Sequence, residues 1–262
     1  MWGESWKLLP NHSVQQSEQV DSSKLYRSRE REISTCGKKG VIVSYKIRNL
    51  ILPIIFVCAP TALAEQPSEQ MLATSKHAVV IVTTYDERGK PKFQGSGFFI
   101  ATDCIVTNAH VIKQASLIRV KTFAGTTVNI QRVIASDTNA DLALLQTDAP
   151  CPQVSTLEMD YSTPVEGEPI TVVSNPKGSH WKTTQGQIGT TWEFQDSGPR
   201  IQITASVLPG SSGGPVLNQH GRVIGIAVAH TASADDLNFA IPAKSLRTLL
   251  PAKMAMLYPS GN

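Results

Sequence analysis

The feature that most constrains the fold is a succession of short, β-favouring runs separated by turns, which begins near residue 76. The runs are rich in valine, isoleucine and threonine, which favour strands over helices. Turn signals stand between them, for example 175–178 (NPKG) and 196–199 (DSGP). Many short strands of this kind predict an all-β sandwich or barrels, and 148–168 is the best connector between two sets of six.

The expected strands are Ala78–Tyr85, Gln94–Ala101, Cys104–Asn108, Leu117–Thr122, Thr126–Ile134, Leu142–Thr147, Ile170–Ser174, Lys182–Phe194, Arg200–Ala205, Pro215–Asn218, Val223–Ala229 and Leu237–Ile241. One helix is expected at Pro242–Leu250, because Leu246, Leu249 and Leu250 share a face there.

Three polar residues stand in segments that suit nucleophilic acyl transfer: His110 in VTNAHV, Asp141 in ADLALL and Ser212 in LPGSSGGP. A serine hydroxyl is a weak nucleophile near neutral pH, so it needs a base to take its proton and a third group to orient that base. Glycine permits the tight turn in which backbone N–H groups point together at a developing oxyanion. The chain order His, Asp, Ser therefore predicts a serine-nucleophile site.

The competing residues are weaker candidates. Asp137 is closest to Asp141, but the apolar run after Asp141 would hold that carboxylate at the mouth of a buried strand. Four other histidines are expected to be structural, because none of them ends a strand of small residues. They are His77, His180, His220 and His230.

Five segments, in order, resemble the chymotrypsin-like serine proteases, specifically the bacterial HtrA/Deg-type and related secreted trypsin-like peptidases. They are 95–100 (GSGFFI), 106–111 (VTNAHV), 140–145 (ADLALL), 209–215 (PGSSGGP) and 238–242 (NFAIP). The resemblance implies an all-β protease domain at 65–262, with a short C-terminal helix and two six-stranded antiparallel β-barrels. The barrels would span about 76–147 and 169–242, with the active site between them.

The resemblance also assigns roles. His110 would be the general base, Asp141 its orienting carboxylate, and Ser212 the nucleophile, because the family's nucleophile directly precedes the Gly-Gly pair. Ser211 fails that criterion. The oxyanion hole would be formed by the backbone N–H groups of Gly210 and Ser212, and no cofactor or metal is needed.

Three departures from the family stand out. No PDZ module is expected after the protease domain. Ser211 stands where digestive relatives have an aspartate that pairs with a newly cut N-terminus, so activation by that ion pair is not expected. A hydroxyl residue after the Gly-Ile pair commonly supports the catalytic aspartate, whereas this chain has Ala227 and Val228 there.

In related enzymes the strand after the Gly-Ile pair and the segment before the final helix wall the primary substrate pocket, and its base lies about six residues before the nucleophile. The expected pocket residues are Ser206, Ala227, Val228, Ala229 and Ala240. Without an acidic base, such a pocket favours Val, Ala, Ile or Leu over Lys or Arg. Asp235 or Asp236 could still fold back and supply a carboxylate.

The charge balance bears on partners. The net charge is +3, but residues 1–64 hold nine of the 24 Lys/Arg and five of the 21 Asp/Glu, which leaves 15 basic and 16 acidic residues in 65–262. No basic run with interleaved aromatic residues occurs there, so we expect a protein or peptide substrate and no nucleic acid. No trimer motif is readable, so the sequence assigns no oligomeric state.

The N-terminal part of the chain predicts export. Residues 46–64 combine a short basic region, an apolar core and an Ala-Leu-Ala end, as in a signal peptide cleaved after Ala64. The alternative is a buried strand or an uncleaved anchor. Residues 1–45 are polar, so we expect disorder or a start of translation near Val41 or Val43. The mature chain would be periplasmic or secreted, without stable membrane insertion.

Cleavage would leave Cys104 and Cys151 as the only cysteines of the mature chain. An oxidising compartment permits a disulfide between them, but two free thiols buried in the core are equally compatible with the sequence. The lack of a CxxC or His/Cys cluster argues against a metal site.

Together these features predict an exported serine endopeptidase that acts through an acyl-enzyme. The main alternative is a non-catalytic relative that binds extended peptides by strand addition, against which the complete set of three groups argues. A serine esterase of another fold is disfavoured, because alternating strand–helix units are missing from the sequence pattern.

Overall fold

The computed structural model describes residues 68–178, 180–229 and 237–252. The chain divides into two compact units, residues 1–59 and 60–262, and all of the described residues lie in the second. The predicted leader 1–45 and signal segment 46–64 therefore lie outside the described residues.

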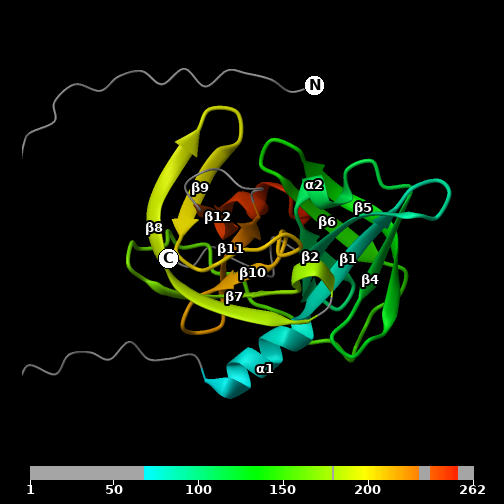
Figure 1. Cartoon of the computed structure of the whole chain (residues 1–262), viewed down its shortest axis with the longest axis horizontal. Helices are drawn as coiled ribbons and strands as arrows, with labels where there is room; N and C mark the ends of the chain where they lie inside the picture. Colours follow the sequence, from blue (N-terminus) through cyan, green and yellow to red (C-terminus); the bar gives the residue numbers. More distant parts are fainter. Residues whose placement is uncertain (1–67, 179, 230–236, 253–262) are drawn as a thin grey trace, which may run out of the picture. The chain divides into compact units, whose positions relative to one another are not determined.

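The described residues form two closed antiparallel barrels of six strands each, as predicted (Figure 1). The first barrel contains β1 (Val79–Tyr85), β2 (Pro91–Ala101), β3 (Cys104–Thr107), β4 (Leu117–Lys121), β5 (Thr127–Asp137) and β6 (Leu142–Thr147). The second contains β7 (Pro169–Ser174), β8 (Lys182–Phe194), β9 (Gly198–Ile203), β10 (Pro215–Leu217), β11 (Val223–Val228) and β12 (Asn238–Pro242). The strand orders are β1-β2-β3-β6-β5-β4 and β10-β11-β12-β9-β8-β7. Closure pairs every strand on both sides, which removes the free edges that an open sheet exposes.

Several strands are buried on both faces. In β3, Ile105 lies in the interior of the first barrel, whereas Cys104 and Val106 lie in a second cluster shared with the other barrel. In β6, Leu145 faces the interior and Leu144 the shared cluster. Successive strand residues point to opposite faces, so the unbroken apolar run in β6 serves two cores at once.

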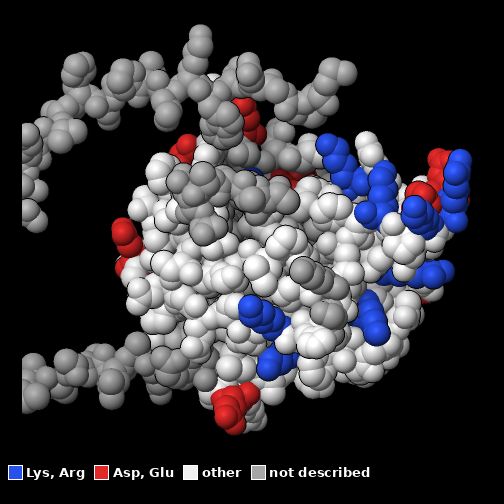
Figure 2. Space-filling model, viewed as in Figure 1, with Lys and Arg blue, Asp and Glu red and all other residues white. Residues whose placement is uncertain are grey.

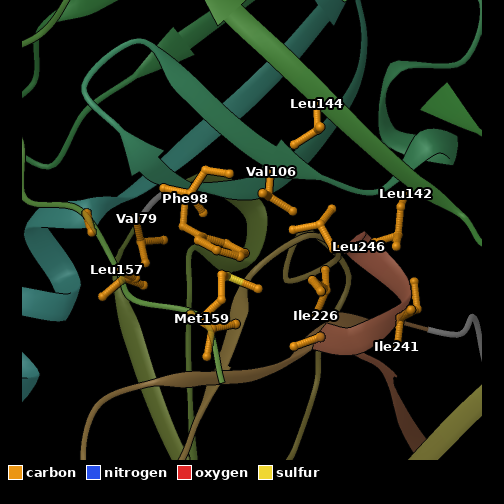
Figure 3. Packing of buried hydrophobic residues seen from close by; sticks show 14 of the residues in the cluster. Val79, Phe98, Val106, Leu142, Leu144, Leu157, Met159, Ile226, Ile241 and Leu246 are labelled. Atoms are coloured by element: carbon orange, nitrogen blue, oxygen red, sulfur yellow. The ribbon is translucent and has the colours of Figure 1, made fainter. Parts of the chain in front are cut away.

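The shared cluster lies between the barrels (Figure 3). Phe98 and Leu142 of the first barrel meet Ile226 of the second, and Met159 of the connector and Leu246 after the last strand complete the cluster. Phe98 and Ile226 are fully buried. Truncation of one such side chain to alanine costs roughly 2–5 kcal/mol. This packing fixes the position of one barrel against the other.

Of the two alternatives for Cys104 and Cys151, the structure has the free thiols: no disulfide joins them, and both are buried. Cys104 points from β3 into the shared cluster, whereas Cys151 belongs to the interior cluster of the first barrel. The two thiols thus lie in different cores. Burial, with a smaller contribution from Asp103, raises the pKa of Cys104 to about 12. Burial also raises the pKa of Cys151, so both thiols remain protonated near neutral pH.

The helical elements differ most from expectation. Helix α1 (Glu69–Ala78) was not predicted; the Ser68 hydroxyl caps it by accepting the Met71 N–H at 3.1 Å. The predicted helix Pro242–Leu250 is instead the 3₁₀ helix η3 (Ala243–Thr248). Pro242 still belongs to β12, and a short segment that only has to bury Leu246 tightens readily into 3₁₀ geometry.

Two further short elements are α2 (Ala109–Ile112) and the 3₁₀ turn η2 (Pro176–Gly178). Within the described ranges, no helix is long and apolar enough to cross a membrane. Figure 2 shows that most Lys and Arg side chains on the viewed face lie over the first barrel, whereas the second barrel presents mainly uncharged residues there. The described residues of this face therefore form no basic band across both barrels.

Candidate active site

The carboxylate of Asp141 holds His110 at two points. Oδ1 accepts the His110 backbone N–H at 2.9 Å, and Oδ2 lies 2.7 Å from the imidazole Nδ1. His110 belongs to α2, on the side of the first barrel that faces the second (Figure 1). The bond to Asp141 favours a proton on Nδ1, which leaves Nε2 as an acceptor. The side chains are only 34% and 18% exposed, so water weakens the contact little.

A tight loop before β6 aims the Asp141 carboxylate. Asp141 has φ +59°, a left-handed conformation that is uncommon for a residue with a side chain. Asp137 Oδ1 accepts the N–H groups of Asn139 and Ala140, and Asn108 Nδ2 donates to the Asp141 carbonyl at 2.9 Å. Asp137, the alternative to Asp141, therefore braces the loop and does not bond His110. Such strain at a polar group is typical of functional sites.

The turn that carries Ser212 is attached to the first barrel through Ser96. The Ser96 N–H donates to the Ser212 carbonyl at 2.8 Å, and the Ser96 hydroxyl donates to the Gly210 carbonyl at 2.8 Å. Gly210 and Gly213 have φ of +93° and +86°, and a Cβ on Gly213 would collide with the Ser96 carbonyl. Glycine is required at Gly213 for both reasons.

Two backbone donors of this turn are unused. Within the described part of the chain, neither the Gly210 N–H nor the Ser212 N–H has a hydrogen-bond acceptor. Neighbouring turn amides are bonded, since Ser211 donates to Leu208 and Gly213 to Ala227. Two free donors two residues apart in a tight turn can receive an oxyanion.

The two adjacent serines differ in their surroundings. The Ser211 hydroxyl is buried and accepts a hydrogen bond from the Ser174 hydroxyl at 3.0 Å. The Ser212 hydroxyl accepts the Ala229 N–H at 3.1 Å, and no hydrogen bond joins it to His110 among the described residues. Because the Ser212 hydroxyl is the acceptor in the bond with Ala229, its proton remains available for donation to a base.

The residues predicted for the primary pocket separate into groups. Ala227 and Ala240 lie in the interior cluster of the second barrel, and Ala229 packs against it. Val228 is not brought into this group; it points from the opposite face of β11 into the cluster between the barrels, as strand alternation requires. Ser206 is exposed. Asp235 and Asp236 lie outside the described residues, as does His230.

Two residues that contact His110 or the loop before Asp141 were not expected from the sequence analysis. The half-exposed Phe93 ring meets the His110 ring edge-to-face, with centroids 5.9 Å apart. Arg200 is 7% exposed and donates from Nη2 to the Ala140 carbonyl, next to Asp141, at 3.4 Å. Ser96 and Asn108, by contrast, lie within the segments GSGFFI and VTNAHV, so the sequence could have indicated that they lie near the site.

Two other described histidines, His77 and His220, make their contacts away from Asp141. His77 packs against Phe123 with ring centroids 4.5 Å apart, and His220 bonds its neighbour Gln219. In the described residues, no three His, Cys, Asp or Glu side chains gather in a group that could hold a metal ion.

Comparisons with known proteins agree with this geometry. The sequence is 30% identical over 186 residues to the anti-sigma-I factor RsgI9 of Acetivibrio thermocellus, covering 71% of this chain and 26% of that protein. It is 34% identical over 163 residues to a probable periplasmic serine endoprotease, DegP-like, of Rhizobium meliloti, covering 60% and 32%. The chain thus spans about a third or less of these relatives.

A solved structure, that of the serine endoprotease from Yersinia pestis, superimposes with a TM-score of 0.61. It is 28% identical, and the match covers 73% of this chain and 68% of that one. A family model described as a trypsin-like peptidase domain matches residues 95–226, which include His110, Asp141 and Ser212. The chain belongs to the trypsin-like peptidase family, and its relatives include HtrA- and DegP-like serine proteases.

Proposed function

We propose that the protein is a serine endopeptidase in which Ser212, His110 and Asp141 act as nucleophile, general base and orienting carboxylate. The observation that carries this proposal is the two-point contact between Asp141 and His110, at 2.9 and 2.7 Å. This contact orients the imidazole and favours the tautomer whose Nε2 accepts a proton, which is what a serine nucleophile requires.

The reaction follows from these groups. Ser212 Oγ attacks the carbonyl carbon of the scissile peptide bond while His110 Nε2 takes its proton. The carbonyl oxygen becomes an oxyanion that accepts from the Gly210 and Ser212 N–H groups. His110 then gives the proton to the leaving amine nitrogen, the C–N bond breaks, and an ester to Ser212 remains. Water, deprotonated by His110, attacks that ester and releases the acid and the free serine.

The substrate is a protein or peptide. The relatives' name of serine endoprotease supports this substrate class. A primary pocket near Ala227, Ala229, Ala240 and Ser206 would favour cleavage after small apolar residues, because the alanine side chains of this group are small and uncharged. We also propose export, because residues 46–64 have the pattern of a signal peptide and one of the relatives is named periplasmic. No cofactor takes part in the proposed steps.

The alternative, a non-catalytic peptide-binding relative, has one observation in its favour: among the described residues no hydrogen bond joins the Ser212 hydroxyl to His110. A neutral hydrogen bond contributes only about 1 kcal/mol, so substrate binding readily supplies the free energy needed to form it. The endopeptidase therefore remains the better account of the site.

A fluorophosphonate probe tests the proposal, because it phosphonylates only an activated serine. The wild-type protein is expected to be labelled and to cleave an unfolded protein, whereas Ser212→Ala does neither. Ser211→Ala is the matched control: it removes the adjacent hydroxyl, which bonds Ser174, and is expected to keep the label. Cleavage-site profiling of the active protein then reads the pocket preference. An unlabelled, folded wild type supports the binding module, and a labelled Ser212→Ala identifies another nucleophile.

A further inference from the structure

Arg200 is the only charged residue in the described part of the chain that is buried, with 7% of its surface exposed. It stands on β9 of the second barrel, next to Ile201, whose side chain lies in the interior of that barrel. Strand alternation directs Arg200 to the other face, towards the first barrel. A buried guanidinium is costly unless its donors are used, so its hydrogen bonds show what the position requires.

Those bonds join the two barrels. Nη1 donates to the carbonyls of Ser197 and Pro199 at 2.6 and 2.9 Å, which holds the guanidinium against its own hairpin. Nη2 reaches across to the carbonyl of Ala140 at 3.4 Å. Ala140 directly precedes Asp141, in the loop where Asp141 has φ +59°. Arg200 thus restrains the residue that aims the Asp141 carboxylate.

The guanidinium also places a positive charge near that carboxylate. The bond from Nη2 to the carbonyl of Ala140, the residue before Asp141, brings the two groups into the same neighbourhood. Burial lowers the pKa of Arg200, and the negative charge of Asp141 opposes that effect. An arginine nonetheless stays protonated at any pH at which the protein is folded. No ion pair joins the two side chains among the described residues, so the charge acts through space while the hydrogen bond acts through Ala140.

This contact stands where the chain departs from its family. The strand after Gly225-Ile226 offers Ala227 and Val228, neither of which has a hydroxyl to support Asp141. Val228 instead packs in the apolar cluster between the barrels. Arg200, like a hydroxyl residue on that strand, would support Asp141 from the second barrel. Its hydrogen bond, however, goes to the main-chain carbonyl of Ala140 and not to the Asp141 carboxylate.

We propose that Arg200 is a positioning residue, which anchors the Asp141 loop to the second barrel and whose positive charge tunes the Asp141–His110 pair. The proposal rests on the endopeptidase mechanism above. A fixed cation disfavours a second positive charge close to it, so removal of the Arg200 charge is expected to move the acid limb of the activity profile to higher pH.

Other charged groups on the surrounding elements are accounted for. They are Asp137 on the loop, Lys92 on β2, Lys113 after α2, and Glu193 and Asp196 on the β8–β9 hairpin. Asp137 is bonded to the loop amides and Lys92 to Gln114, while Lys113, Glu193 and Asp196 are exposed and screened by water. The strands β6 and β11 present only apolar and small residues to the pair, apart from Gln146 at the far end of β6.

The test compares Arg200→Gln with Arg200→Lys. Glutamine removes the charge and is too short to reach the Ala140 carbonyl, whereas lysine keeps the charge and loses the forked geometry. We expect the acid-side midpoint of the kcat/KM–pH profile to rise by about 0.5–1 pH unit in Arg200→Gln, as expected for loss of one nearby charge in a partly buried site. In Arg200→Lys the midpoint stays at the wild-type value while kcat falls several-fold.

A merely structural role would lower the melting temperature of both variants and leave both midpoints unchanged, which overturns the proposal. Equal shifts in the two variants overturn it as well, because charge would then be irrelevant. If Arg200→Gln does not fold, Arg200→Met supplies a second neutral variant that retains the apolar stem. Titration of the His110 ring by NMR in a Ser212→Ala background gives the same readout without turnover. Failure of the endopeptidase mechanism appears separately, as an unlabelled wild type in the fluorophosphonate assay.

Discussion

Substitution of Ser96 by alanine isolates the link between the first barrel and the nucleophile turn. The Ser96 hydroxyl is fully buried; it donates to the Gly210 carbonyl at 2.8 Å and accepts the Asn175 N–H at 3.0 Å. Ser96→Ala leaves two buried backbone groups without partners. Each unsatisfied group costs about 1–3 kcal/mol, and partial relaxation reduces the sum, so we expect a loss of about 2–4 kcal/mol in the free energy of unfolding.

The same change frees the Gly210 carbonyl and so loosens Gly210, whose N–H stands on the preceding peptide. We expect kcat to fall by about 10- to 100-fold with little change in KM, because the oxyanion donor matters mainly in the transition state. Urea unfolding and steady-state hydrolysis measure the two effects. Thr84→Val is the matched control: Thr84 is equally buried, but its hydroxyl makes one long bond of 3.3 Å to the Phe93 carbonyl. A Ser96→Ala protein as stable and as active as Thr84→Val would refute the role of Ser96.

Two further outcomes follow from the site and the cores. Asp141→Asn should lower kcat by about 10³–10⁴-fold, because an amide stabilises the wrong imidazole tautomer, whereas Asp137→Asn should stay within a few-fold of wild type; similar losses in both variants contradict the assignment. Because the folded state holds the Cys104 pKa near 12, against an ordinary value of 9.0, the unfolded chain loses that proton first as the pH rises. The free energy of unfolding should therefore fall above pH 9, with a contribution of up to about 1.4 kcal/mol per pH unit that Cys104→Ala removes. Denaturant unfolding under reducing conditions at pH 8 and 10.5 measures this, and equal pH slopes in the two proteins exclude it.

The strands could be predicted because strand formation follows local patterning, whereas their closure into two barrels was implied by the resemblance to the chymotrypsin-like proteases. Valine- and isoleucine-rich runs such as β1 and β11 are separated by turn residues, and their spacing in two sets of six leaves few alternatives. The motif segments also lie where the pattern puts them, with His110 just after β3 and Asp141 just before β6.

Helix α1, the state of the cysteines and the role of Arg200 could not be predicted, because each depends on contacts between segments that are distant in the sequence. Helix α1 begins with a serine cap but has only a weak apolar face, so tertiary packing against β1 decides it. The cysteines are only 47 positions apart in sequence. Cys104, however, lies on the face of β3 that points to the cluster between the barrels, whereas Cys151 lies in the interior cluster of the first barrel. Arg200 had no local signal, because its acceptor Ala140 lies 60 residues away in the other barrel.

The apolar cluster between the barrels also limits when the two barrels can dock as the chain is synthesised. The first barrel ends at Thr147, so its Phe98 and Leu142 have no partners from the second barrel until later strands have been made. Ile241 and Leu246, which belong to the same cluster, come from β12 and η3, late in the chain. A partly synthesised chain can therefore contain His110 and Asp141 without the docked turn of Ser212. The proposed site is complete only after this late docking step, so assembly of the site should coincide with the last stage of folding.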